Sequence, residues 1–175
     1  QKIFSIENLK KILNKEKEKG KRIVLCHGVF DLLHLGHIQH FEEAKNHGDI
    51  LVVTVTSDQY VNKGPNRPAF QEDNRLRALE ALQVIDYVAL NKNPTAIPAI
   101  KELRPNIYCK GQDYKVYQND ISGEIKNEIS AIKKIGGKIF YTGGISFSSS
   151  KLINQNEVNS ELHKVLIKKI KKNYN

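Results

Sequence analysis

The stretch that decides the fold of this chain is Leu25-Cys26-His27-Gly28-Val29-Phe30-Asp31-Leu32-Leu33-His34-Leu35-Gly36-His37. The run over residues 22–26 predicts a short buried strand, the chain turns at Gly28, and a helical pattern begins near Leu35. His34 and His37 are three residues apart, which places both rings on one face of the first helical turn. The N–H groups of that turn lack intrahelical partners and attract an anion. Together these features indicate a phosphate site.

This stretch resembles the HxGH signature of the nucleotidyltransferase superfamily, which includes the cytidylyltransferases and the heptose-phosphate adenylyltransferases. The signature itself is His34-Leu35-Gly36-His37, and Gly28-Val29-Phe30-Asp31 is the usual lead-in. A bare HxGH is a weak signal, but a Gly-x-Phe-Asp before it and a strand before that make the match specific. The resemblance covers about residues 22–155 and implies the HxGH nucleotidyltransferase fold.

Composition predicts a soluble globular protein. The chain has 175 residues, enough for a single core, and no apolar run approaches membrane length. The N-terminal segment is polar and amphipathic, unlike a signal peptide. The two cysteines, Cys26 and Cys109, fall in predicted strands, which favours reduced core thiols and a cytoplasmic location, where nucleoside triphosphates are available.

Basic residues outnumber acidic ones, with 28 Lys and Arg against 19 Asp and Glu for a net charge of +9. Such a chain can bind nucleic acid, anionic lipid or an anionic small molecule. Much of the excess, however, lies in residues 10–22 and 164–172, where few aromatic residues interleave with the lysines. We therefore predict solvated faces in these segments and neither a nucleic-acid nor a membrane partner.

Helical and strand patterns alternate along the chain. Helices are expected over residues 6–19, 37–47, 71–82, 95–103 and 124–135, and strands over 22–26, 49–55, 84–90, 106–109 and 138–141. This alternation predicts an α/β fold, a Rossmann-like parallel sheet with helices on both faces. Ligands of such sheets bind beyond the carboxyl ends of the strands. Four loops that carry motifs follow strands and should meet there: the signature turn and residues 57–68, 110–114 and 143–150.

The chain is expected to form one nucleotidyltransferase domain over residues 1–175, with its core at about 22–155. An N-terminal helix over 5–20 has Ser5 as its cap, and a C-terminal amphipathic helix covers about 157–172. That last helix either covers the core, joins a homodimer or lies on a membrane, and we favour the first two.

The paired histidines are phosphate ligands, zinc ligands or ordinary residues of a helix start. Zinc requires three or four ligands, and no Cys or carboxylate stands nearby at a suitable spacing, so we predict no protein-held metal. The resemblance assigns His34 and His37 to holding an α-phosphate. His40 and His47 are expected at the surface.

The residues around the histidines are assigned to nucleotide binding on the same resemblance. Gly28, Val29, Phe30, Asp31 and Gly36 form this set, and Gly36 would let the backbone approach the nucleotide closely. Phe30 is expected in the core rather than stacked on a base. Asp31 either caps the following helix or orients the site.

Two basic residues also match residues of the superfamily. Lys63, in a loop over residues 57–68, matches a superfamily lysine that balances triphosphate charge, and we group it with His34 and His37 as catalytic. Arg75 matches a family arginine and is assigned to substrate binding, with a surface ion pair as the alternative.

Two further motifs follow later strands. Lys110-Gly111-Gln112-Asp113-Tyr114 resembles the Lys-Gly-Gly-Asp-Tyr of heptose-type enzymes, which assigns Lys110 to the nucleotide. Asp113 is assigned to a sugar hydroxyl or a metal-bound water, or it only forms a turn. Ser148, Ser149 and Ser150 either cap a helix or cradle the β- and γ-phosphates, as the matching family element does.

The sequence therefore predicts an enzyme that joins a nucleoside triphosphate to a phosphorylated sugar or polyol and releases pyrophosphate, with Mg²⁺ carried by the triphosphate. Adenylyl transfer to a heptose-like sugar phosphate is favoured, because residues 110–114 match and the cytidylyltransferase Arg-Thr-Glu is missing before Gly144. CTP-dependent transfer to glycerol 3-phosphate or another polyol phosphate is the alternative, and a non-catalytic nucleotide-binding module is the alternative of another class. Expected partners are a second copy of the chain and a sugar kinase, in the same pathway or polypeptide.

Overall fold

A parallel sheet of five strands organises the chain in a computed structural model, which describes residues 1–64, 66–115 and 123–143. The strands are β1 (Ile23–Gly28), β2 (Ile50–Thr56), β3 (Tyr87–Asn91), β4 (Ile107–Gly111) and β5 (Lys138–Thr142). Their order across the sheet is β3-β2-β1-β4-β5. All pairings are parallel, so every strand ends at the same edge.

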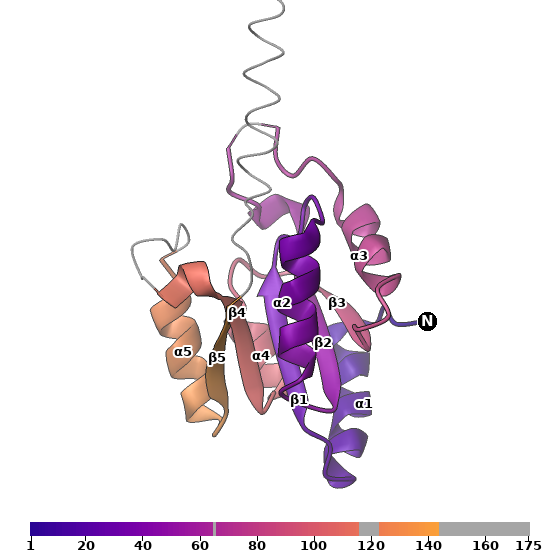
Figure 1. Cartoon of the computed structure of the whole chain (residues 1–175), viewed down its shortest axis with the longest axis vertical. Coiled ribbons are helices and arrows are strands. Elements are labelled where there is room, and N and C mark those ends of the chain that lie inside the picture. The colour runs from indigo at the N-terminus through magenta and orange to yellow at the C-terminus, as the bar shows by residue number, and fades with distance from the viewer. Residues whose placement is uncertain (65, 116–122, 144–175) are drawn as a thin grey trace, which may run out of the picture.

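Helices cover both faces of this sheet (Figure 1). They are α1 (Ile6–Glu18), α2 (Leu35–Lys45), α3 (Glu72–Glu80), α4 (Ile97–Leu103) and α5 (Ile125–Lys134), with short 3₁₀ turns η1 (Asp58–Tyr60) and η2 (Gln112–Lys115). The buried side chains of α2 and α3 pack with Val24 and Cys26 on one face. Those of α1, α4 and α5 pack with Ile23 and Leu25 on the other. Successive residues of β1 thus serve opposite layers, as a strand buried on both sides requires.

The predicted fold class is confirmed, and the differences lie at element ends. β1 runs on to Gly28 because its backbone stays paired with β2 as far as Val55. The helix expected to follow Asn93-Pro94 begins only at Ile97, with proline in its first turn. Ser5 caps α1 as predicted, its side chain accepting a hydrogen bond from the Asn8 N–H at 3.2 Å.

The residues before α1 add to the edge of the sheet, which the sequence patterns did not indicate. Ile3 forms a parallel bridge with Val88 of β3. The Phe4 N–H donates to the Val88 carbonyl at 3.0 Å, and the Val88 N–H donates to the Lys2 carbonyl at 2.9 Å. Because the partners are more than eighty positions apart, no local pattern could announce the pairing.

The helices expected to start among 148–150 and to cover 157–172 lie outside the described residues. Among the helices of the described ranges, none is both long and apolar enough to cross a membrane.

Candidate active site

The turn after β1 brings the signature residues to the carboxyl edge of the sheet. Phe30 has a left-handed backbone conformation, with φ of 49°, which is uncommon for a residue with a side chain. Its ring is buried in the core, as the sequence analysis favoured. A Cβ on Gly28 would lie only 3.0 Å from that ring, so the glycine makes room for the phenyl group. The buried Phe30 ring therefore fixes the turn to the core.

His34 and His37 meet at the start of α2. His34 is the N-cap residue, and its carbonyl accepts a hydrogen bond from the His37 N–H at 2.9 Å. The two rings are stacked, with centroids 3.9 Å apart and planes 21° from parallel. The His37 ring also contacts the edge of Phe30 at 5.4 Å between centroids. The predicted arrangement of both imidazoles on one face of the first turn is therefore present.

The surroundings of the pair oppose positive charge on the rings. Burial, followed by the charges of His34, His40 and Lys63, lowers the pKa of His37 from 6.5 to about 3. Burial also lowers the pKa of His34. Nδ1 of His37 is buried and has no hydrogen-bond partner among the described residues. Two neutral imidazoles at a helix N-terminus, where the first backbone N–H groups lack i−4 partners within the helix, form a site that an anion would complete.

His40 and His47 are half-buried rather than fully exposed, which corrects the prediction in part. Nδ1 of His40 lies 2.7 Å from Oγ1 of Thr142 at the end of β5, and burial followed by the charge of Lys110 lowers its pKa to about 4. His47 is half-buried, with its ring 3.7 Å from that of Phe140. His40 therefore helps to fix α2 against β5.

His27 is a further half-buried histidine, to which sequence reasoning gave no role. Its Nδ1 lies 2.9 Å from Oγ1 of Thr54, and its Nε2 lies 3.3 Å from Oγ1 of Thr56. Burial and then the charge of Lys110 lower the pKa of His27 to about 4. The alternation of polar residues at positions 27, 54 and 56 near two strand ends was the available signal.

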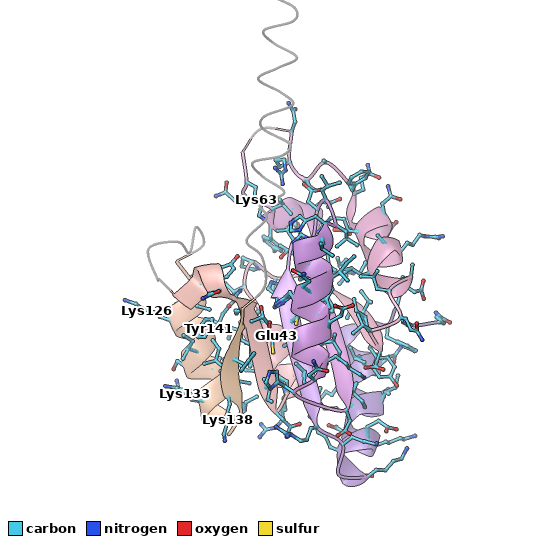
Figure 2. The ribbon with its side chains drawn as sticks, in the orientation of Figure 1. Glu43, Lys63, Lys126, Lys133, Lys138 and Tyr141 are labelled. Atoms are coloured by element: carbon cyan, nitrogen blue, oxygen red, sulfur yellow. The ribbon has the colours of Figure 1, made fainter. Side chains whose placement is uncertain are left out.

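Lys63 lies at the end of the molecule where α2 begins (Figure 2). Its side chain is half-buried, and burial followed by the charge of Arg67 lowers its pKa. Its own charge contributes to the low pKa of His37, so the two groups share one electrostatic environment. Lys63 is therefore near enough to His37 for its charge to act on that ring.

Asp31 does not cap α2, since His34 holds that position. One oxygen of its buried carboxylate accepts hydrogen bonds from Arg67 Nε and the Ala69 N–H, both at 2.9 Å, and the other accepts one from the Phe70 N–H at 2.9 Å. Burial acts to raise the pKa of Asp31, but these hydrogen bonds and the Arg67 charge outweigh it and hold the pKa below its usual value. Asp31 therefore ties the signature turn to the loop between β2 and α3.

Arg75 is enclosed in the protein, which corrects the alternative of a surface ion pair. Its side chain is fully buried, and it forms its ion pair with Asp58 from inside the fold. Nε donates to the Phe70 carbonyl at 2.9 Å and Nη1 to the Val29 carbonyl at 2.5 Å. Nη2 donates to the Thr56 carbonyl at 2.8 Å and to Asp58 at 2.6 Å. By donating to these four acceptors, Arg75 braces the loops around the site.

Lys110 is buried and forms an ion pair within the fold. Its Nζ lies 3.2 Å from Oε2 of the buried Glu128 and 4.3 Å from the centre of the Tyr114 ring. The Tyr108 hydroxyl donates to the same glutamate oxygen at 2.9 Å. Glu128 was missed, although a glutamate between Ile125 and Ile132 on an apolar helix face was a readable signal.

Some predicted residues are not described in enough detail for a role. Ser148, Ser149 and Ser150 lie outside the described residues, as does the side chain of Asp113, whose backbone is in η2. Gly36 lies in the first turn of α2, between the two histidines. In the described part of the chain, no group of three or more His, Cys, Asp or Glu side chains is arranged to hold a metal ion.

The chain is similar to proteins of a known family. Residues 25–156 match the model of the family described as cytidylyltransferase-like. The chain is 35% identical over 139 residues to "Bifunctional protein HldE" of Aliarcobacter butzleri, covering 78% of this chain and 29% of that protein. It is 42% identical over 115 residues to the protein of the same name from Geobacter metallireducens, covering 65% and 24%. The chain thus spans less than a third of the length of these curated relatives.

Two solved structures are similar in fold. The lipopolysaccharide core biosynthesis protein from Thermoplasma volcanium is 32% identical with a TM-score of 0.60, covering 73% of this chain and all of that one. A pantoate-beta-alanine ligase from Francisella tularensis has a TM-score of 0.62 at 18% identity, covering 88% and 73%. At that identity the second likeness concerns the fold alone.

Proposed function

The chain belongs to the cytidylyltransferase-like family of nucleotidyltransferases, and from this premise we propose that it transfers a nucleotidyl group from a nucleoside triphosphate to the phosphate of a sugar. An oxygen of the acceptor phosphate attacks the α-phosphorus, the bond from that phosphorus to the bridging oxygen breaks, and pyrophosphate leaves. Such a reaction needs positioning and charge stabilisation more than a nucleophilic side chain.

The stacked histidine pair carries this proposal. Negative charge on the α-phosphate spreads over its equatorial oxygens during the transfer, and preorganised donors aimed at those oxygens stabilise it. His34 and His37 are held on one turn at the N-terminus of α2, with their ring centroids 3.9 Å apart, and a helix N-terminus favours anions. Lys63 adds a cation whose pKa is lowered mainly by burial, so a bound triphosphate would offset the cost of holding it there.

Magnesium is proposed as a companion of the triphosphate. The described residues offer no carboxylate cluster for it, and Mg²⁺ in nucleotide sites is often held largely by substrate phosphates and water. When bound, it would neutralise charge on the phosphates. Every other contribution described above belongs to the protein's own side chains.

We favour adenylyl transfer to a heptose-like sugar phosphate. Support comes from the motif at residues 110–114 and from the similarity to proteins named HldE and to one named a lipopolysaccharide core biosynthesis protein. The HldE relatives are named bifunctional and are much longer than this chain, which favours a partner activity that supplies the sugar phosphate, such as a sugar kinase. A single domain, a homodimer and a cytoplasmic location, where nucleoside triphosphates are available, belong to the same proposal.

Pyrophosphate release in the presence of Mg²⁺ tests the proposal. ATP, CTP, GTP and UTP are each combined with a panel of sugar 1-phosphates, including heptose 1-phosphate, and with glycerol 3-phosphate. Release that requires both ATP and the heptose phosphate is the expected result. Release with CTP and glycerol 3-phosphate would replace the adenylyl assignment by the cytidylyl alternative. Tight nucleotide binding, measured by calorimetry, without release from any pair would indicate a binding module.

A further inference from the structure

Arg67, in the loop between β2 and α3, has a buried charge without a complete set of partners. Its side chain is only 1% exposed, and its Nε donates to Asp31 at 2.9 Å. Nη1 and Nη2 are both buried and have no hydrogen-bond partner among the described residues. Buried polar groups are normally satisfied, and leaving guanidinium donors unpaired is costly. Such a residue indicates a site that a ligand fills.

The chemistry of this end of Arg67 specifies the ligand class. A guanidinium group presents parallel N–H donors whose spacing matches two oxygens of a phosphate or carboxylate. Asp31 provides some negative charge nearby, but its two oxygens already accept three hydrogen bonds. Lys63 adds further positive charge close to Arg67. We call Arg67, Asp31 and Lys63 together the Arg67 corner. The ligand that matches its charge and its donors is an oxyanion.

The corner adjoins the histidine pair. Asp31, which holds Arg67, follows Phe30 directly, and the Phe30 ring contacts that of His37 at 5.4 Å between centroids. Lys63 interacts electrostatically with both Arg67 and His37. An anion at Arg67 would therefore lie next to a phosphate at the start of α2.

The strand order places the nucleotide and the anion at Arg67 on different sides of β1. The direction of the chain across the sheet reverses between β1 and β4, and nucleotides in such sheets bind at that reversal. The loop that carries Arg67 follows β2, which lies on the opposite side of β1 from β4. The Arg67 corner is thus displaced from the nucleotide side while remaining beside the α-phosphate position. In nucleotidyl transfer, the group that must stand there is the attacking phosphate.

We propose that Arg67 is a substrate-binding residue whose Nη1 and Nη2 hold the phosphate of the acceptor, with Asp31 fixing the guanidinium through Nε. This assignment rests on the proposed nucleotidyl transfer. It places the acceptor phosphate at Arg67, while Lys63 of the same loop serves the triphosphate.

Steady-state kinetics of the full chain test the assignment with the nucleotide and acceptor that the pyrophosphate assay identifies. Arg67→Gln and Arg67→Lys are compared with Arg77→Gln, which makes the same change at an exposed position on α3. In Arg67→Gln the KM for the acceptor should rise roughly 10- to 100-fold, as the loss of charge-assisted hydrogen bonds implies, with the KM for the nucleotide within about twofold. Arg67→Lys retains the charge facing Asp31 but lacks the fork, so its acceptor KM should also rise. A rise confined to the nucleotide KM, or no rise at all, would overturn the proposal.

A binding measurement separates this assignment from the proposed reaction. Inorganic phosphate is titrated calorimetrically into each folded variant, without nucleotide, after circular dichroism has confirmed the fold. Both Arg67 variants should bind it roughly tenfold or more weakly than the unchanged chain, and Arg77→Gln should bind it equally well. If no substrate pair releases pyrophosphate, the proposed function fails, yet this titration still decides whether Arg67 holds a phosphate. Equal affinity in all the chains would refute the site.

Discussion

Replacing Arg75 with lysine separates the role that the structure gives this residue from the role predicted from sequence. The guanidinium donates four hydrogen bonds, to three backbone carbonyls and to Asp58, at distances from 2.5 to 2.9 Å. A lysine ammonium has one nitrogen and cannot reach acceptors on all sides, so at least two of these bonds are lost. Each lost bond to a charged donor costs about 1.5–3 kcal/mol, and water reaching the loop carbonyls offsets part of this. We expect the free energy of unfolding to fall by about 2–4 kcal/mol.

Urea unfolding followed by circular dichroism measures this change. Arg75→Lys should lower the midpoint without changing the slope, because the mutation alters stability and not the surface exposed on unfolding. Arg77→Lys on the exposed side of α3 is the matched control and should stay within about 0.5 kcal/mol of the unchanged chain. If Arg75→Lys unfolded like the unchanged chain but required more acceptor for half-maximal rate, the bracing role would be wrong and substrate binding right.

Three further predictions concern the surroundings of the site. Gly28→Ala should destabilise the protein by about 1–3 kcal/mol in urea, because the new Cβ would stand 3.0 Å from the Phe30 ring, whereas Gly111→Ala meets nothing within 4 Å and should be nearly neutral. Glu128→Gln should cost about 3–5 kcal/mol by leaving Lys110 buried without its counter-charge, while Glu102→Gln breaks only an exposed pair with Lys10 and should cost under about 1 kcal/mol. Unfolding at pH 5 should take up about three protons, because His27, His37 and His40 have folded pKa values of about 3 to 4 against 6.5 when unfolded. The free energy of unfolding should therefore decrease as the pH falls from 6.5 towards 4. His40→Gln should make this decrease shallower. If His40→Gln left the slope unchanged, the result would count against a buried neutral ring at position 40.

The sheet and the histidine pair were predictable because their signals are local. Apolar runs with turn residues between them specify strands, and a spacing of three specifies a shared helix face, whatever the rest of the chain does. Ser5 capped its helix for the same reason. Among the predicted helices and strands the differences are at the ends, as with α4, whose proline belongs to the first turn.

The side chains that were misplaced depend on partners far away in the sequence. His40 is half-buried because Thr142 reaches it from a strand 102 positions later. Arg75 was assigned to substrate by resemblance, and only the assembled loops show that four protein acceptors surround it. Asp31 was expected either to cap a helix or to orient the site, but the donors that its carboxylate accepts from lie 36 to 39 positions away in the next loop. A polar side chain can bind any of several distant partners, and the sequence pattern does not show which partner it will bind.

The rate of pyrophosphate release by His37→Ala tests the central claim most directly. The ring of His37 is stacked on that of His34 at the start of α2, where we place the α-phosphate of the triphosphate. His47→Ala, beyond the other end of α2, is the matched control, and circular dichroism confirms the fold of both variants. The account predicts a loss of about 10²–10³-fold or more in turnover for His37→Ala and near-unchanged turnover for His47→Ala. A folded His37→Ala enzyme with undiminished turnover would contradict it.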